Sequence, residues 1–487
     1  MNDELALLDA TAQAELVRAG QVSAAELVTA AIERIETLNP VLNAVVTPAF
    51  ERAAEAVRTG FAGRAGPAGP FAGVPYLVKD LACEMKGVRF TEGSRFLAGN
   101  VSAFDSELVL RLRRAGLVIL GKTSTPEFGM APACEPVLFG PVRNPWDTGR
   151  STSGSSGGSA AAVASGMVPF AHGNDLGGSL RYPASACGLF ALKPTRARNP
   201  LGPGYGDVAA GGAAEHALTR SVRDSAALLD ATSGPDLGDP YWAPPPARPF
   251  GAEAGADPGR LRIGYTTRTP DGDLGHPDCV AAAEHAARLC ASLGHEVTET
   301  GWPGFTPDVG AAIGTMMSAA AAWIMRYWIR HVGREPGAEE IEPLTRALWQ
   351  AGEKVTAAQW LLAVGDVQRF SRRVARFFTG FDAFLTPTMS TPPLPIGTMV
   401  STPTDPWRSL QVSGQSVRYA GVVANLTGNP AMSVPLWWND DGLPIGVHFL
   451  GGFGDEATLI RLAAQLEAAQ PWSGRRPAVH AARPREP

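Results

Sequence analysis

Lysine is scarce in this sequence of 487 residues: it occurs only at Lys79, Lys86, Lys122, Lys193 and Lys354, and the other 37 of the 42 basic residues are arginine. The abundance of Ala, Gly and Pro indicates a codon bias, so the scarcity by itself predicts no function. It does single out each remaining lysine, because a buried lysine can give up its proton near neutral pH and arginine cannot.

An excess of positive charge is also missing. The 42 basic residues face 47 acidic ones, which leaves a net charge of −5, so we expect neither a nucleic-acid-binding surface nor a polybasic membrane surface. The five cysteines include no CxxC pair and no Cys/His spacing suited to zinc. We therefore expect no metal, and reduced, mostly buried thiols typical of a cytoplasmic protein.

Long apolar segments of the kind that cross or enter membranes are absent as well. The N-terminal sequence MNDELALLDATAQAELV lacks the basic and apolar regions of a secretory signal. The uncharged run 309–325, VGAAIGTMMSAAAAWIM, is rich in Ala and Gly and shorter than the roughly 20 strongly apolar residues that a membrane span requires. We expect a buried helix there and no membrane association.

What is present is an alternation of strand-like and helical segments, typical of an α/β sheet covered on both faces. Helical periodicity runs from residue 3 to about 60 with Ser23 as a helix N-cap, VPYLVKDL reads as a buried strand, 108–115 as a helix and 116–120 as a strand. About 150 residues per domain would give about three domains. Without repeats, however, the pattern favours one large domain with a helical insertion.

The predicted boundaries follow from these segments and from composition. We expect one domain over 1–475 and a flexible tail over 473–487. Within the domain we expect a helical N-terminal part (1–65), a core (66–235), an exposed Pro-rich connection (240–259), a helical insertion (about 300–380) and a return to the core (381–472).

A Gly/Ser-rich block from 149 to 195 is the part of the sequence most informative about chemistry. Ser155 in GSSGG and Ser179 in LGGSLR lie 24 residues apart, in loops whose small residues let backbone N–H groups approach a developing oxyanion. A hairpin-like return of the chain could bring the two serines together. Upstream, Lys79 lies inside the apolar VPYLVKDL, where loss of hydration disfavours the ammonium form and makes lysine a usable base.

Each of these features also has a purely structural interpretation. A Gly/Ser loop can be a turn or linker, and this one lacks the GK[ST] ending of a phosphate-binding loop. Lys79 could pair with the adjacent Asp80, and Asp175 with Arg181 could pin the second serine loop. His172 could serve a Ser-His-Asp arrangement, but no GxSxG motif accompanies it.

Taken together, these segments resemble one family. The run 153–195 with VPYLVKDL upstream is similar to the signature of the amidase signature family of serine hydrolases. The likeness extends to LNPVLNAVV, GKTSTPEFG, RNPWDTGRS and NLTGNPAMSVPLWWNDDGLPIGVHFLGG, and so covers almost the whole chain. Within the family, DATAQAELV, FAGVPYLVKDL and AHGND are similar to nylon-oligomer hydrolases, and urethane-cleaving members share a similar core. The resemblance implies a central, mixed, twisted sheet with helices on both faces.

The resemblance also implies a Ser–cis-Ser–Lys triad. Ser179 matches the nucleophile, Ser155 the bridging serine whose peptide bond to Gly154 is cis, and Lys79 the base. The physical argument agrees, because a serine hydroxyl needs a base to attack an amide and a distant lysine can act through a second hydroxyl.

Further residues are matched to supporting roles. The oxyanion hole would be formed by the backbone N–H groups of Leu176, Gly177, Gly178 and Ser179. Supporting residues would be Gly154, Ser156, Asp175 and Arg181.

The substrate pocket is the least determined part of the site. The stretch TMMSAAAAW at 315–323 holds no cysteine, whereas nylon-oligomer hydrolases use one from this insertion. We take Met130, Met316, Met317 and Trp323 as candidate pocket residues, with a core role as the alternative. Arg198 could face the mouth of the site or could be a solvated surface residue.

The predicted function is hydrolysis of C–N bonds in amides, with carbamates and nylon-type oligoamides as further candidate substrates. The expected partner is the small-molecule substrate. No cofactor is implied, and a homodimer is implied by the family alone. Two alternatives stay open: an amidotransferase subunit that releases ammonia from glutamine for a partner, and an inactive scaffold of the same fold.

Overall fold

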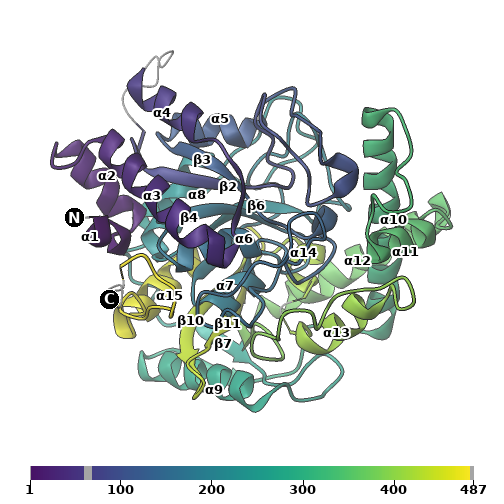
Figure 1. The fold of residues 1–487 in the computed structure, drawn as a ribbon. Coiled ribbons are helices and arrows are strands. Elements are labelled where there is room, and N and C mark those ends of the chain that lie inside the picture. Colours follow the sequence, from purple (N-terminus) through teal and green to yellow (C-terminus); the bar gives the residue numbers. More distant parts are fainter. Residues whose placement is uncertain (1, 60–68, 420, 483–487) are drawn as a thin grey trace.

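The computed structural model describes residues 2–59, 69–419 and 421–482. One 11-stranded sheet runs through the molecule in the order β1-β3-β2-β4-β6-β5-β10-β11-β9-β7-β8 (Figure 1). Its strands are β1 Val45–Pro48, β2 Pro75–Lys79, β3 Val118–Thr123, β4 Phe170–Asp175, β5 Phe190–Lys193, β6 Ala214–Thr219, β7 Arg262–Tyr265, β8 Glu296–Glu299, β9 Ala383–Pro387, β10 Ala431–Trp438 and β11 Pro444–Gly451.

The α-helices are α1 Asn2–Leu7, α2 Ala10–Arg18, α3 Ala24–Leu42, α4 Phe50–Arg58, α5 Glu107–Arg114, α6 Gly157–Ala164, α7 Arg181–Cys187, α8 Val222–Thr232, α9 Pro277–Ser292, α10 Pro307–Val332, α11 Pro343–Gly352, α12 Ala357–Phe377, α13 Arg408–Ser416, α14 Val423–Thr427 and α15 Glu456–Ala469. Three short 3₁₀ turns complete the elements: η1 Arg95–Leu97, η2 Glu127–Gly129 and η3 Phe250–Ala252.

The sheet is mixed, and its two faces are both covered, as predicted. β2 runs parallel to β3 and β4, whereas β4 and β6 are antiparallel. Side chains alternate across the sheet: Leu77 packs with α3, α6 and α7, whereas its neighbours Tyr76 and Val78 pack with α2, α5 and α8. Because helices cover the side chains on both faces of the sheet, every residue of β2 is buried.

The N-terminal part is helical except for one strand that periodicity did not reveal. Ser23 caps α3 as predicted, and Glu26 closes the capping box. The helix ends at Leu42, Asn43 adopts a left-handed conformation with φ 54°, and the chain enters β1, which pairs antiparallel with β3. Pairing with a strand far along the chain overrides the local pattern here.

The predicted helical insertion is formed by α10, α11 and α12, which lie together at one side of the sheet (Figure 1). By length and composition alone, the segment Val309–Val332 of α10 could cross a membrane, and 33% of its most apolar window is buried in the fold. Its buried residues pack against α11 and α12. We therefore interpret it as a helix of the folded domain.

Two boundary predictions need adjustment. The connection 240–259 is largely exposed, but Phe250 and Glu253 within it are buried. The predicted tail does not begin at 473, because the Val479 N–H donates to the Pro145 carbonyl (3.0 Å) and the Ala481 N–H to the Ser165 carbonyl (2.8 Å). Residues 483–487 of that tail lie outside the described residues.

Candidate active site

Lys79 is the last residue of β2, at the centre of the parallel part of the sheet, and its side chain is fully buried. The Nζ donates to Ser155 Oγ (2.6 Å) and to Asn174 Oδ1 (2.6 Å). Asn174 in turn lies in β4, the strand beside β2. The lysine is thus held by two neighbouring elements and aimed at the first serine of the SSGG pair.

Burial lowers the pKa of Lys79 to about 7, although the nearby acidic groups, Glu215 first, favour the charged form and limit the fall. About half of such lysines are neutral at pH 7. The alternative pairing with Asp80 is wrong. The Asp80 carboxylate accepts from Thr91 Oγ1 (2.5 Å) and lies 3.8 Å from Lys122 Nζ, on the other side of the strand end.

The two Gly/Ser loops come together, as the hairpin-like return predicted. The peptide bond between Gly154 and Ser155 is cis, as the resemblance implies. A Cβ at Gly154 would lie 2.8 Å from the Ala133 nitrogen, so backbone packing requires glycine there. One residue on, the Ser156 N–H donates to the Ser179 carbonyl (3.3 Å). This bond joins the bridging-serine loop directly to the loop that carries the predicted nucleophile.

Asp175 organises the second loop from inside. Its carboxylate accepts from the backbone N–H groups of Gly178 (2.7 Å) and Leu180 (3.1 Å), from Asn425 Nδ2 (2.9 Å), and from Nε and Nη2 of Arg181 (3.0 and 2.9 Å). Burial alone would raise the pKa of Asp175, but the Arg181 guanidinium holds it well below its usual range. The geometry therefore favours a supporting role for this buried ion pair, which holds the second serine loop in place.

One of the four predicted oxyanion-hole donors is already used within the loop. Because the Gly178 N–H is already donated to Asp175, it is not free for a substrate oxygen. Within residues 2–59, 69–419 and 421–482, the N–H groups of Leu176, Gly177 and Ser179 have no acceptor. These three free donors are the set that the loop can offer to an oxyanion.

His172 does not form a Ser-His-Asp triad. Its Nδ1 accepts from the Lys79 backbone N–H (3.2 Å), and its Nε2 lies 2.5 Å from Glu215 Oε2. Since Nδ1 is an acceptor, the ring proton lies on Nε2 and points to the carboxylate. In the described part of the chain the ring makes no hydrogen bond to either serine. His172 instead fixes the backbone of β2 at the lysine.

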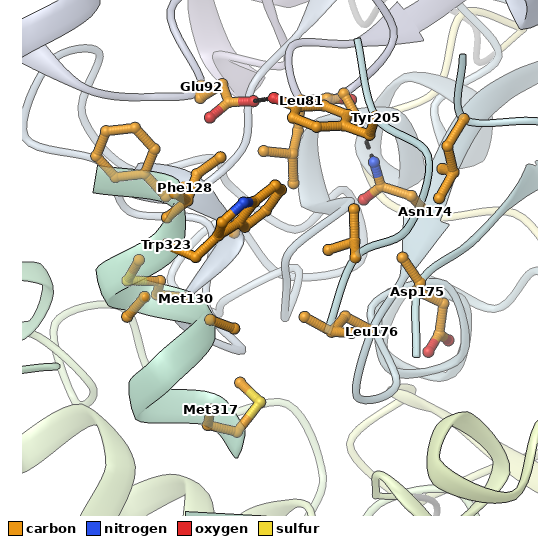
Figure 2. A pocket seen from close by; sticks show the side chains of 18 of the residues that line it. Leu81, Glu92, Phe128, Met130, Asn174, Asp175, Leu176, Tyr205, Met317 and Trp323 are labelled. Carbon is orange, nitrogen blue, oxygen red and sulfur yellow. Dashed lines mark hydrogen bonds between the residues drawn. The ribbon is translucent and has the colours of Figure 1, made fainter. Parts of the chain in front are cut away.

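A cavity of about 110 Å³ adjoins this group and is lined mainly by apolar side chains (Figure 2). It lies beside Lys79 and Ser155, since Asn174, which accepts a hydrogen bond from Lys79, and Gly129, next to Ser155, both line it. Its lining residues are Leu81, Ala82, Glu92, Phe128, Gly129, Met130, Asn174, Asp175, Leu176, Leu201, Tyr205, Val208, Ala213, Glu215, Met317, Ala320, Ala321, Trp323, Ile324 and Leu348.

Three of the five candidate pocket residues, Met130, Met317 and Trp323, line this cavity, and two do not. Met316 packs in a buried core cluster instead. Arg198 neither faces the site nor is solvated: it is only 3% exposed, and its Nε and Nη2 donate to the two oxygens of Glu456 (2.9 Å each). Both interpretations of Arg198 were wrong.

Sequence reasoning missed four polar residues of the cavity: Glu92, Asn174, Tyr205 and Glu215. Glu92 lies in the polar stretch TEGS and Tyr205 in the turn-like GPGYGD, and neither pattern indicates burial. Of the described residues, no group of His, Cys, Asp and Glu could hold a metal ion.

Known proteins are similar to this chain in sequence and in fold. A family model described as Amidase matches residues 26–460. The 6-aminohexanoate-cyclic-dimer hydrolase of Paenarthrobacter ureafaciens is 40% identical over 484 residues, which cover 96% of each protein. A solved 6-aminohexanoate cyclic dimer hydrolase complexed with substrate has a TM-score of 0.92 at 39% identity, covering 97% of this chain and 99% of that one.

A bacterial aryl acylamidase of the amidase signature family has a TM-score of 0.83 at 27% identity, covering 96% of this chain and 97% of that one. The chain therefore belongs to the amidase signature family, and it is an enzyme that hydrolyses the carbon–nitrogen bond of amides.

Proposed function

We propose that the enzyme acts through an acyl-enzyme on Ser179, with Ser155 as proton relay and Lys79 as base. The observation that carries this proposal is the buried 2.6 Å contact between Lys79 Nζ and Ser155 Oγ, next to the loop that holds Ser179. A hydroxyl attacks an amide only when a base takes its proton. A lysine whose pKa is lowered to about 7 can do so at neutral pH.

In the proposed first step, Ser179 Oγ attacks the amide carbonyl carbon, its proton passes to Ser155 Oγ, and the Ser155 proton passes to Lys79 Nζ. When the tetrahedral intermediate collapses, the C–N bond breaks and the relay returns a proton to the leaving amine nitrogen. Water then attacks the ester by the same route and releases the acid. The N–H groups of Leu176, Gly177 and Ser179 would hold the oxyanion, and losing one such donor typically costs roughly 100-fold or more in rate.

For the substrate, we propose small amides with an apolar acyl or amine part, because the cavity beside the triad is mostly apolar. The 6-aminohexanoate-cyclic-dimer hydrolase similarity supports oligoamides of the nylon type, and carbamates are the second substrate class, which would pass through a carbamoyl-enzyme. The absence of a cysteine in TMMSAAAAW, where Met317 lines the cavity, supports linear or aryl amides over the cyclic dimer itself.

Two further proposals concern the protein as a whole. The five cysteines are all free and buried, which supports a reducing, cytoplasmic location. The homodimer implied by the family stays a prediction, which light scattering coupled to size-exclusion chromatography would test.

A hydrolysis panel tests the proposed function. Aryl amides, linear and cyclic aliphatic amides, carbamates, esters and glutamine would be assayed with the wild type, with Ser179→Ala as the blank. We expect turnover of at least one amide, with loss of nearly all of it in the variant. Turnover that persists in Ser179→Ala would refute the acyl-enzyme. Glutamine as the preferred substrate would instead support the amidotransferase alternative, which the similarity to hydrolases does not favour.

A further inference from the structure

The cavity beside the triad has an acidic lining and no basic one. Glu92, Asp175 and Glu215 line it, and no Lys, Arg or His does so in the described part of the chain. Asp175 is paired with Arg181, and Glu215 lies against His172. The third carboxyl group, that of Glu92, is different, because none of the described residues forms an ion pair with it.

Glu92 is 1% exposed, and neutral groups satisfy its oxygens. Trp328 Nε1 donates to Oε2 (2.8 Å), and the Tyr205 hydroxyl lies 3.4 Å from Oε1. Buried carboxylates are usually paired with a cation or bound to a metal. A buried, unpaired carboxyl group that faces a substrate cavity therefore points to a cation supplied by the ligand.

Aromatic rings surround the same end of the cavity. The Tyr205 ring centroid lies 5.6 Å from that of Trp323 and 5.2 Å from that of Tyr327, and the latter two are 6.0 Å apart. Trp323 and Tyr205 both line the cavity. Rings grouped in this way attract ammonium groups through their faces.

We propose that this end of the cavity binds the amino group of substrates that carry a primary amine away from the scissile amide, with Glu92 as the specificity-determining residue. Figure 2 shows Glu92, Tyr205 and Trp323 on one side of the cavity and Asp175, next to the nucleophile loop, on the other. An extended substrate would thus present its amide to Ser179 and its amine to Glu92. This inference rests on the proposed function and adds the substrate class.

The protonation chemistry of Glu92 fits this role. Burial, together with the nearby Glu84 and Asp80, raises the pKa of Glu92 to about 8, although the Trp328 hydrogen bond lowers it. The carboxyl group is therefore mostly protonated in the empty cavity at pH 7. An entering neutral amine takes up that proton, which leaves an ammonium and a carboxylate in contact and needs no other reactant. Carboxylate-bearing substrates find no positive lining group and are disfavoured.

A matched pair of substrates tests the proposal: 6-aminohexanoyl p-nitroanilide and heptanoyl p-nitroanilide, which differ in a terminal amine or methyl group. A charged hydrogen bond predicts a preference for the amino substrate in kcat/KM of about tenfold or more in the wild type. In Glu92→Gln this preference should disappear, while heptanoyl p-nitroanilide is still hydrolysed. As a matched control, Glu467→Gln removes another carboxyl whose pKa burial raises, to about 7, on α15, and should keep the preference.

Equal kcat/KM for the two substrates in the wild type, or an unchanged preference in Glu92→Gln, would overturn the proposal. Calorimetry of hexylamine and hexanoate binding to the wild type decides the matter without turnover or variants. Hexylamine should bind about tenfold or more tightly, and equal or tighter binding of hexanoate would contradict the proposal. If the wild type hydrolysed neither anilide but still bound hexylamine more tightly than hexanoate, the result would count against the proposed function and not against the amine site.

Discussion

The acid side of the pH–rate profile follows from the buried base. Because burial lowers the pKa of Lys79 to about 7, the neutral form falls from about half at pH 7 to about one part in 100 at pH 5. Only the neutral amine can accept the proton of the nucleophile. Between pH 8 and pH 5, kcat/KM should therefore fall by about 100-fold, with a slope of one decade per pH unit below pH 6.

The assay is the initial rate of anilide hydrolysis at substrate concentrations well below KM, with circular dichroism at each pH to show that the enzyme stays folded. Other buried groups titrate in the same range, among them Glu92, whose pKa burial raises to about 8, and Lys193, whose pKa burial lowers to about 7. The variants Glu92→Gln and Lys193→Met should both keep the acid limb on a neutral substrate. A flat profile down to pH 5 in the folded wild type would refute the lysine-base reasoning.

Four substitutions provide further tests. Lys79→Arg keeps the charge but removes the titration, so kcat should fall by about 1,000-fold, whereas Lys354→Arg at an exposed position should leave kcat unchanged. Arg198→Met leaves the buried Glu456 carboxylate unpaired, so urea unfolding should show a loss of about 3–5 kcal/mol, with anilide turnover within about twofold of wild type; an unchanged stability would contradict the buried pair. Arg181→Met should lower both stability and kcat, because Asp175 then loses the partner that keeps it ionised; unchanged kcat would show that the loop holds its shape without the pair.

Local sequence patterns singled out the residues at the centre of the candidate site. Lys79 is recognisable as a lysine within an apolar strand, and the serine loops as Gly/Ser runs whose small residues leave the backbone open. The resemblance then assigned the roles of Ser155 and Ser179. The structure adds why these parts meet: β2 and β4 are neighbours in the sheet, and Ser156 and Ser179 share a backbone hydrogen bond.

What could not be predicted depends on contacts between distant parts of the chain. Arg198 looks like a surface residue until Glu456, 258 positions later, is placed against it. Glu92 shows no sign of burial in TEGS, and its partner Trp328 comes from α10, 236 positions away. The use of the Gly178 N–H by Asp175 is a local event, but it depends on the exact path of the loop, which composition does not determine.

The central claim is that Ser179 is the nucleophile and that Lys79 activates it through Ser155. The most direct measurement is covalent labelling with a serine-directed fluorophosphonate, followed by peptide mass spectrometry and by the labelling rate in variants. We predict a single adduct on Ser179, no adduct in Ser179→Ala, and labelling slowed by about 100-fold or more in both Ser155→Ala and Lys79→Arg. An adduct on another residue, or a rate that does not depend on Lys79, would contradict the account.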